Sequence, residues 1–452
     1  MPDAVPSPPI SAGPGNPLAR RIGLFDATTA VVGGIVGAGI FMNPSVVARI
    51  VPTPTLILAA WFLGGVVALL GAWIYAELGS ARPVTGGQYA YFRDAFHPCV
   101  AFLYGWGLLW VIQSGGMAAV AVTFARYAII LTGWTGYERS LAVGALAFLT
   151  FVNCFGVRAG AATQSLFTVL KALAIAALVV CGFLGTAPDP SVALQATAPE
   201  TAGIGWAEFG AAMVPVLFAY GGWQTACFLA GEVRAPERTL PRALVLGIAA
   251  VITLYLAVNV VCLRTLGPAG LAATSTPASD VMSRALGPAG ERFLAAGIVV
   301  STFGFLSQGM LTTPRVYFAM ARDGLFFPAL GRVHATSHAP VAAILLQGSV
   351  AALIACSGRY EAILNYVVSV DFIFYGLVGV CVFVFRRRGE SHAPFRIPAH
   401  PWTTLFFIGI CWIIVANLTW KQPADSLKGL GILLAGIPIY FVWKRLRPSP
   451  TP

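Results

Sequence analysis

The sequence has little charge and lacks the motifs of nucleotide chemistry. Only 10% of its 452 residues are Asp, Glu, Lys or Arg, whereas 58% are hydrophobic, and the mean hydropathy is +0.79. It contains no G-x-x-x-x-G-K-[ST] motif and no Gly-Lys dipeptide, which argues against an ATP-driven pump. None of its eight cysteines forms a CxxC motif, so no disulfide framework is expected. This composition excludes an ordinary soluble protein.

Long apolar runs fill most of the chain and predict an all-α integral membrane protein. A run of about 20 apolar residues spans a bilayer, and runs that are continuous rather than alternating disfavour a β-barrel. We expect twelve transmembrane helices, at residues 24–50, 54–79, 98–131, 140–157, 160–186, 207–231, 241–263, 293–320, 339–356, 361–385, 403–420 and 427–443. The segment 79–96 is expected to add a short interfacial helix.

The net charge of +11 does not indicate a nucleic-acid partner, because of where the charges lie. With the N-terminus inside, Lys and Arg concentrate in the cytoplasmic segments, as the positive-inside rule requires. The run 386–388, three arginines, then marks the end of a span. The sequence therefore predicts a multi-pass protein of the cell (plasma or inner) membrane with both termini cytoplasmic. Residues 1–19 lack the features of a signal peptide and are expected to be a disordered tail.

Glycine and proline interrupt two of the expected spans. The first reads "VVGGIVGAGIFMNPS" and the sixth reads "VPVLFAYGGWQTACF". Broken helices at corresponding positions are typical of inverted-repeat transporters. A break exposes backbone N–H and C=O groups, which the bilayer tolerates only where they line a cavity or bind a ligand. The N–H end suits a carboxylate and the C=O end suits an ammonium group. Alternatively, Gly33 and Gly37 serve only close helix packing.

Spacing of the two interrupted spans implies a division of the chain into repeats. The breaks lie five spans apart, and an odd repeat length places the second repeat inverted in the membrane. We expect five segments: a tail at 1–19, a first five-helix repeat at 20–186, a second, inverted five-helix repeat at 187–388, two additional helices at 389–447, and a C-terminal tail at 448–452.

Several long motifs resemble the amino acid–polyamine–organocation superfamily, and within it the L-type and related bacterial amino-acid permeases. They are "GIVGAGIF", "FAYGGW" followed by "GEVRAPERTLPRAL", "FTVLKALAI", "PRVYFAMARDG" and "PVTGGQYAYFRDAF", and they occur in the family's order. The resemblance covers about residues 20 to 445. It implies a LeuT-type fold that works by alternating access.

The resemblance also implies a substrate site at the two breaks. Gly37, Ala38 and Gly39 would bind the α-carboxylate, and Ala219, Gly221 and the backbone around them would bind the α-amino group. Phe218 would close over the substrate from outside. The family often has Ser where this chain has Ala38, so a hydroxyl contact is lost. The full set of expected substrate-binding residues is Gly37, Ala38, Gly39, Ile40, Phe218, Ala219, Tyr220, Gly221, Ser307 and Asp371.

Two ionisable residues within the spans are functional candidates, because an unpartnered charge in the bilayer is costly. Lys171 matches a lysine that, in the resembling families, occupies the place of a sodium ion and makes transport sodium-independent. The alternative is a lysine that snorkels to the interface. Asp371 lies where L-type transporters tend to have Asn. It is expected to contact the substrate, carry a proton or pair with a cationic substrate, or else to be a structural acid. Glu77, Glu232 and Arg234 are expected to form an inner gate or interfacial ion pairs.

The sequence thus predicts a non-enzymatic secondary transporter of amino acids that acts as an exchanger or a proton symporter. Its expected partners are a small amino acid, membrane lipid and, for symport, protons. No cofactor and no metal are expected, since His334 and His338 lack a third ligand. The short loop "TGWTGYE" has no cysteine that would join a heavy chain. The alternatives are a polyamine or amine carrier of the same fold and a non-transporting amino-acid sensor.

Overall fold

A computed structural model describes most of the chain, and the part that it describes is helical. The described residues are 22–83, 86–155, 161–186, 205–228, 230, 233–332, 334, 340–357, 359–390 and 393–446. Within them there is no β-strand, only a single parallel β-bridge between Ile22 and Val233. The expected tails at 1–19 and 448–452, as well as Glu232, fall outside these ranges.

The helices follow one another with short connections. In chain order they are α1 (Leu24–Ile35), α2 (Gly39–Ile50), α3 (Pro54–Ala81), α4 (Gln88–Ala95), α5 (Pro98–Gly107), the π-helix η1 (Leu108–Ile112), α6 (Gln113–Thr132), α7 (Glu138–Cys154), α8 (Ala161–Gly185), α10 (Trp206–Tyr220), α11 (Thr225–Phe228), α12 (Pro236–Ala273), α13 (Pro277–Thr312), α14 (Pro314–Arg322), the 3₁₀ helix η3 (Pro328–Gly331), α15 (Val341–Ser357), α16 (Tyr360–Arg387), α17 (Trp402–Lys421) and α18 (Pro423–Leu446).

Length and hydropathy make many of these helices able to cross a membrane. Over the described residues, eight helical stretches are long and apolar enough to do so, or nine if α1 and α2, which meet at a bend of 40°, are counted as one span. A further apolar helix at Val341–Cys356 is shorter. The chain is therefore a multi-pass helical membrane protein, and the count of twelve spans stays a prediction.

Two helical stretches extend beyond the predicted spans. The predicted spans at 241–263 and 293–320 correspond to helical stretches that extend further, in α12 and in α13 with α14. Each long helix contains one glycine in the left-handed region, Gly267 with φ 66° and Gly287 with φ 68°, and each glycine is followed by a proline. Glycine turns the chain there, and the proline begins a new helical stretch. Hydropathy alone misses these added turns because they are less apolar than the spans.

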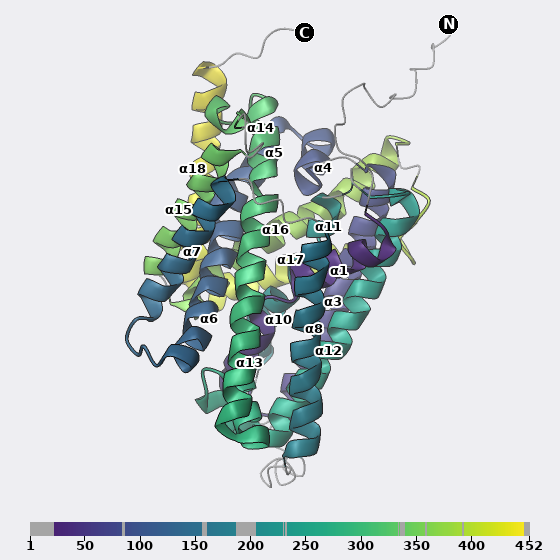
Figure 1. Ribbon diagram of the computed structural model, residues 1–452. Coiled ribbons are helices and arrows are strands. Elements are labelled where there is room, and N and C mark those ends of the chain that lie inside the picture. The colour runs from purple at the N-terminus through teal and green to yellow at the C-terminus, as the bar shows by residue number, and fades with distance from the viewer. Residues whose placement is uncertain are drawn as a thin grey trace, which may run out of the picture.

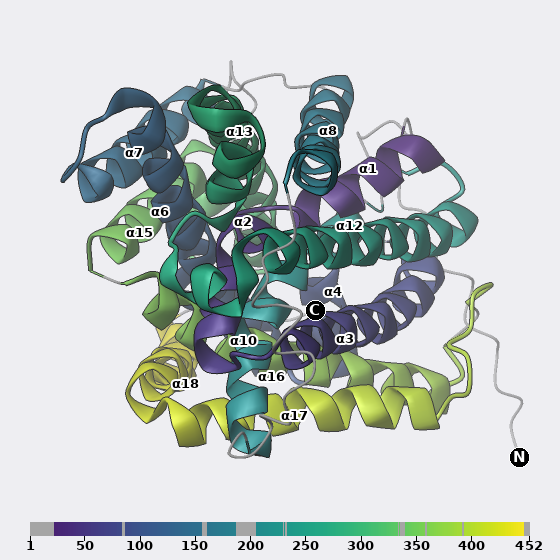
Figure 2. The same ribbon diagram turned by 90° about the horizontal axis from the view of Figure 1, so that it is seen from below.

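The interrupted ends of α1 and α10 lie inside the bundle, whereas the opposite ends of both helices are exposed. Figure 1 shows the long helices running side by side, with α4 and α14 at one end of the molecule. Seen from below in Figure 2, α10 runs from the middle of the bundle across α17, which lies along the outer edge. Helix α10 contacts α2, α3, α16 and α17, and α1 contacts α8, α11 and α12. The breaks between α1 and α2 and between α10 and α11 are thus shielded from the surroundings.

Charged side chains join several helices at the end of the molecule that carries α4 and α14. Arg82 pairs with Asp94 at 3.2 Å, and Arg93 pairs with Asp323 at 3.0 Å. The Tyr89 hydroxyl donates a hydrogen bond to Asp323 at 2.8 Å. Burial, and then the Asp323 carboxylate, raise the pKa of Tyr89 above its usual range, so its phenol remains a donor. Helix α4, which the sequence predicted, is therefore held to the segment after α14.

A buried carboxylate ties α3 to the end of α16. Glu77 is only 1% exposed. Its two oxygens accept hydrogen bonds from Arg386 at 2.8 and 2.7 Å, and the Ile397 backbone N–H donates a third at 2.8 Å. Such a bidentate arginine–carboxylate pair is among the stronger polar contacts in proteins. Glu77 was expected to form either an inner gate or an interfacial ion pair, and the geometry shows an ion pair that joins helix ends. The Arg234 backbone N–H donates to the carbonyl of Ile22 at 2.9 Å, beside the β-bridge.

Candidate functional site

The chain leaves the helical conformation at two places that lie against each other. Helix α1 ends at Ile35 and α2 begins at Gly39, whereas α10 ends at Tyr220 and α11 begins at Thr225. Gly222 has φ 111°, a region that side-chain-bearing residues rarely adopt. A Cβ atom there would overlap the carbonyl oxygen of Gly34. The two breaks can approach this closely only because both positions are glycine.

Helix α2 begins directly against the backbone of α10. A Cβ atom at Gly39 would lie 2.6 Å from both Cα and Cβ of Ala219, closer than real carbon atoms approach. At Gly37 a Cβ would lie 3.3 Å from the ring of Phe305. Gly37 and Gly39 in the first break therefore serve close packing as well as the interruption of the helix.

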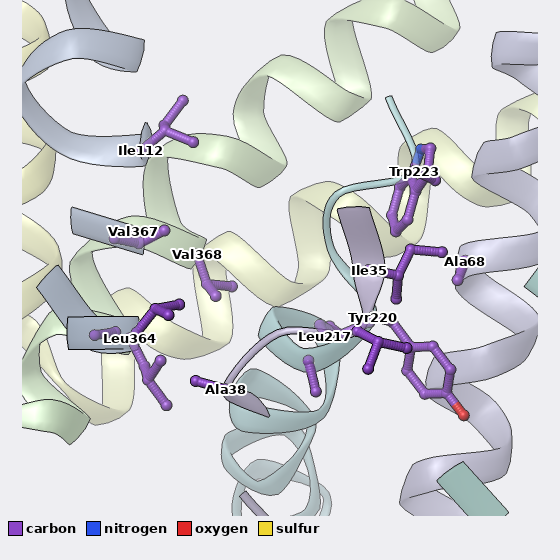
Figure 3. Packing of buried hydrophobic residues seen from close by; sticks show 14 of the residues in the cluster. Ile35, Ala38, Ala68, Ile112, Leu217, Tyr220, Trp223, Leu364, Val367 and Val368 are labelled. Carbon is purple, nitrogen blue, oxygen red and sulfur yellow. The ribbon is translucent and has the colours of Figure 1, made fainter. Parts of the chain in front are cut away.

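A small cavity of about 90 Å³ lies beside the breaks. Its walls come from both interrupted helices, from η1 and the start of α6, from α13 and from α16. Figure 3 shows the packed side chains around the breaks, with Ile112 and Val368 on one side, Leu217 and Ile35 on the other, and Ala38 below Val368. The lining residues are Gly34, Ile35, Gly37, Ala38, Gly39, Ile112, Gln113, Gly116, Val120, Leu217, Phe218, Ala219, Gly221, Gly222, Gln224, Phe305, Val367, Val368, Asp371 and Phe372.

The start of α2 brings unpaired donors to this cavity. The first N–H groups of a helix have no partner within it. Among the described residues no acceptor contacts the backbone N–H groups of Gly37, Ala38 or Gly39, whereas the N–H of Phe41 donates to the carbonyl of Ala38 at 3.1 Å. The three residues with unpaired N–H groups all line the cavity. A helix N-terminus also carries partial positive charge, so this wall is suited to an anionic group such as a carboxylate.

The carbonyl groups at the breaks are partly occupied by side chains. The Tyr255 hydroxyl lies 3.2 Å from the carbonyl oxygen of Ile35 and 3.1 Å from that of Ala219. The Lys171 ammonium donates to the Val36 carbonyl at 3.3 Å and lies 5.5 Å from the centroid of the Phe305 ring. A carbonyl oxygen has two lone pairs, so these contacts leave acceptor capacity for a substrate amino group.

Three polar side chains line the cavity: Asp371, Gln113 and Gln224. The Gln224 Oε1 atom accepts from the Tyr375 hydroxyl at 3.1 Å and from the Gly222 backbone N–H at 3.1 Å. These two contacts fix Gln224 between α10 and α16. No Lys or Arg forms an ion pair with Asp371 within the described ranges. Among the described residues, the one acidic side chain in the cavity wall, Asp371, therefore has no side-chain cation as a partner.

The structure brings most of the expected binding residues together at this cavity. Ile40 and Tyr220 do not line it; both are fully buried, and the ring of Tyr220 packs against Trp61 and Tyr255 instead. Ser307 and Lys171 also lie outside its wall. The expected residues that do line the cavity are Gly37, Ala38, Gly39, Phe218, Ala219, Gly221 and Asp371.

Sequence reasoning missed the wall that the third predicted span contributes. The π-helix Leu108–Ile112 adds a residue to the turn just before Gln113, and both Ile112 and Gln113 line the cavity. Single π-helical turns are frequent at functional sites. The apolar run across 98–131 contains Gly105, Gly107, Gly115 and Gly116 but no internal proline, and these glycines were not interpreted as a break.

The fold and the cavity define a class of protein: a multi-pass helical membrane protein with a small cavity beside the places where two helices are interrupted. The sequence profile of the family described as "Amino acid permease" matches residues 22–442. The chain belongs to this family.

Its relatives include bacterial and mammalian transporters. The chain is 32% identical over 447 residues to the "Serine/threonine exchanger SteT" of Bacillus subtilis (strain 168), which covers 96% of this chain and 99% of that protein. It is 30% identical over 443 residues to the "Large neutral amino acids transporter small subunit 2" of Rattus norvegicus, and the match covers 96% of this chain and 82% of that protein. It is 28% identical over 445 residues to the "Asc-type amino acid transporter 1" of Mus musculus, and the match covers 96% of this chain and 83% of that protein. These relatives are amino-acid transporters and exchangers.

Proposed function

We propose that this permease is a secondary transporter that carries amino acids by alternating access, with the central cavity as its substrate site. The observation that carries the proposal is the row of unpaired N–H groups at Gly37, Ala38 and Gly39, which line the cavity at the N-terminus of α2. They supply what an α-carboxylate needs inside a bilayer without any cationic side chain. Phe218 lies in the wall and is proposed as the side chain that closes over the substrate.

The fold proposed for this transporter is the LeuT type. Its twelve spans would comprise two inverted repeats of five helices, residues 20–186 and 187–388, with α17 and α18 as the two additional helices. The position of α17 at the outer edge of the bundle supports its assignment outside the repeats. The positive-inside rule supports cytoplasmic termini, with the ion-paired end of the molecule toward the cytoplasm.

Small amino acids are the proposed substrates. The cavity is about 90 Å³ in volume, and glycine or alanine contributes seven of its lining positions at the breaks: Gly34, Gly37, Ala38, Gly39, Ala219, Gly221 and Gly222. The name of the Bacillus subtilis relative, a serine/threonine exchanger, agrees with a small substrate and with exchange as the mode of transport. Absence of a heavy-chain partner stays a prediction from the sequence.

Sodium independence is proposed from Lys171. Its ammonium group is held between the Val36 carbonyl of the first break and the Phe305 ring of α13. A fixed cation at that place supplies the positive charge that a sodium ion would bring, and it joins the first span to the eighth. Replacing external sodium by choline should leave uptake unchanged; a strict sodium requirement would contradict the role of Lys171.

The test of the whole proposal is direct. Purified protein is screened by thermal shift against all amino acids and against the amines that result from their decarboxylation. We expect stabilisation by small amino acids and none by the amines, because an amine lacks the group that the α2 N-terminus binds. Uptake of the stabilising amino acid into proteoliposomes then separates a transporter from a sensor. Stabilisation by amines alone would overturn the substrate assignment, and binding without uptake would overturn transport.

A further inference from the structure

A second cavity lies between α8 and α13, on a membrane-facing side of the molecule. Its volume is about 600 Å³, and its lining residues are Leu170, Lys171, Leu173, Ala174, Ala177, Phe293, Ala296, Gly297, Val300 and Ser301. Large apolar side chains on its walls are open to the surroundings; Leu173 is 59% exposed and Phe293 is 67% exposed. In a bilayer such a surface contacts hydrocarbon, so the cavity is accessible to membrane-dissolved molecules.

Two buried polar groups belong to this otherwise apolar cavity. Lys171 and Ser301 are each only 2% exposed. In the described part of the chain the Ser301 hydroxyl has no hydrogen-bond partner, and the Lys171 ammonium, which has three donors, has a single acceptor in the Val36 carbonyl. A buried donor without a partner is costly, and such groups in native structures call for an explanation. An ammonium group and a hydroxyl together are the donors that recognise a carboxylate.

The depth of these groups restricts what can reach them. Helix α8 begins at Ala161, and at 1.5 Å per residue Lys171 lies about 15 Å along its axis, near the middle of a 30 Å hydrocarbon core. A phospholipid headgroup stays at the interface and does not reach that depth. A single-chain carboxylic acid can cross the hydrocarbon in its uncharged form, and its chain matches the apolar walls.

We propose that the α8–α13 cavity is a binding site for a long-chain carboxylic acid, of the free fatty acid class, whose carboxylate contacts Lys171 and Ser301. The hydrocarbon chain of the acid lies against Leu173, Phe293 and the other apolar wall residues. The two donors offset the cost of placing the carboxylate in hydrocarbon. An ester or an alcohol of equal chain length carries no negative charge that the Lys171 ammonium could attract.

Occupancy of this site would reach the central cavity through two contacts. Lys171 holds the Val36 carbonyl at the first break, and Phe305, beside its ammonium, lines the central cavity and packs against Gly37. A carboxylate that draws the ammonium away from Val36 loosens the first break. A bound acid should therefore slow transport. This regulatory consequence rests on the proposed function, whereas binding of the acid does not.

Photolabelling tests the binding step independently of transport. The full-length protein in liposomes is exposed to a palmitic acid analogue that carries a diazirine on its chain, and the labelled peptides are mapped by mass spectrometry. We expect labels on α8 and α13 within the cavity, removed by excess palmitic acid but not by methyl palmitate or by phosphatidylglycerol. Equal competition by the methyl ester, competition by phosphatidylglycerol, or labels elsewhere would overturn the proposal.

Two variants sharpen this test. A Cβ at Gly297 would meet Ala174 at an ordinary 3.5 Å, so Gly297→Leu fills the cavity without backbone strain and should reduce labelling about tenfold. Ser301→Ala removes one donor to a charged group and should weaken competition by palmitic acid about tenfold. Gly144→Leu on α7 is the matched control, because a Cβ there meets nothing within 4 Å, and it should label like the parent protein.

Uptake by the same proteoliposomes measures the regulatory step. Palmitic acid should slow uptake by the parent protein and by Gly144→Leu, and much less by Gly297→Leu. If the cavity is labelled but palmitic acid does not slow uptake by the parent protein, the regulatory step is refuted and the binding site stands. If no variant transports any amino acid, the proposed function fails, and the labelling result still decides the site.

Discussion

A side chain at Gly39 should disable substrate binding by pushing the start of α2 away from α10. A Cβ at this position would lie 2.6 Å from Cα and Cβ of Ala219, whereas ordinary contacts between such atoms begin at 3.4 Å. Relief therefore requires a movement of about 0.8 Å, and the atoms that resist it are backbone. Because the N–H groups of Gly37, Ala38 and Gly39 are displaced together, the carboxylate loses its alignment with all of them.

Overpacking of this kind typically costs about 1–3 kcal/mol, which corresponds to roughly a 5- to 150-fold weaker Kd if all of it falls on the binding-competent state. Gly39→Ala should lie at the lower end of this range and Gly39→Val at or beyond the upper end. The order of the two variants is itself a prediction, since the added methyl groups of valine enlarge the clash.

The assay is the Kd of the best amino-acid ligand, from thermal-shift titration of purified protein, together with uptake into proteoliposomes. Gly144→Ala and Gly144→Val on α7 serve as matched controls, because nothing lies within 4 Å of a Cβ at that glycine. Both controls should bind like the parent protein. Near-normal affinity and uptake in Gly39→Val would refute the assignment of the α2 N-terminus as the carboxylate site.

Three further predictions follow from other contacts. Asp371→Asn preserves the cavity shape and removes the acid: if Asp371 carries a proton, pH-driven accumulation should disappear while exchange remains, and an unchanged pH dependence would exclude that role. Gly116 lines the cavity and a Cβ there meets nothing within 4 Å, so Gly116→Val should retain the smallest substrate and exclude larger ones, measured as a shift in competition profile. Glu77→Gln should lower the free energy of unfolding by about 3 kcal/mol, because it leaves Arg386 without its buried partner. The exposed pair of Arg49 with Glu361 gives the control, because Glu361→Gln should lower the free energy of unfolding by less than about 1 kcal/mol. Equal losses of thermal stability in Glu77→Gln and Glu361→Gln would contradict this prediction.

Much of the helical architecture is predictable from composition, because the bilayer imposes a simple rule on length and hydropathy. The positions of the two interruptions are also predictable, since glycine and proline within an apolar run are costly unless a break requires them. The breaks at Gly37 and at Gly221 lie where these residues indicated. The extents of α12 and α13 were not predictable from hydropathy, because the turns beyond Gly267 and before Gly287 are not apolar spans.

The composition of the cavity wall was only partly accessible from sequence. Backbone donors at a break depend on where the chain stops being helical, and the glycines mark that place. The direction of a side chain depends instead on helical register. Tyr220 and Ile40 are sequence neighbours of cavity residues but point into packed surroundings. Gln113 enters the wall through a π-helical turn, which depends on packing between helices and leaves no local signature.

One hydroxyl group has a mechanical consequence for the transport cycle. Tyr255 on α12 lies within hydrogen-bonding distance of carbonyl oxygens on both interrupted helices, Ile35 at the end of α1 and Ala219 near the end of α10. The hydroxyl has one proton, which the two carbonyl oxygens share, and a movement of either helix end away from α12 gives up one of these contacts. In the proposed transport cycle, the two half-helices and α12 would therefore move as one unit, and the neighbouring helices would move past it.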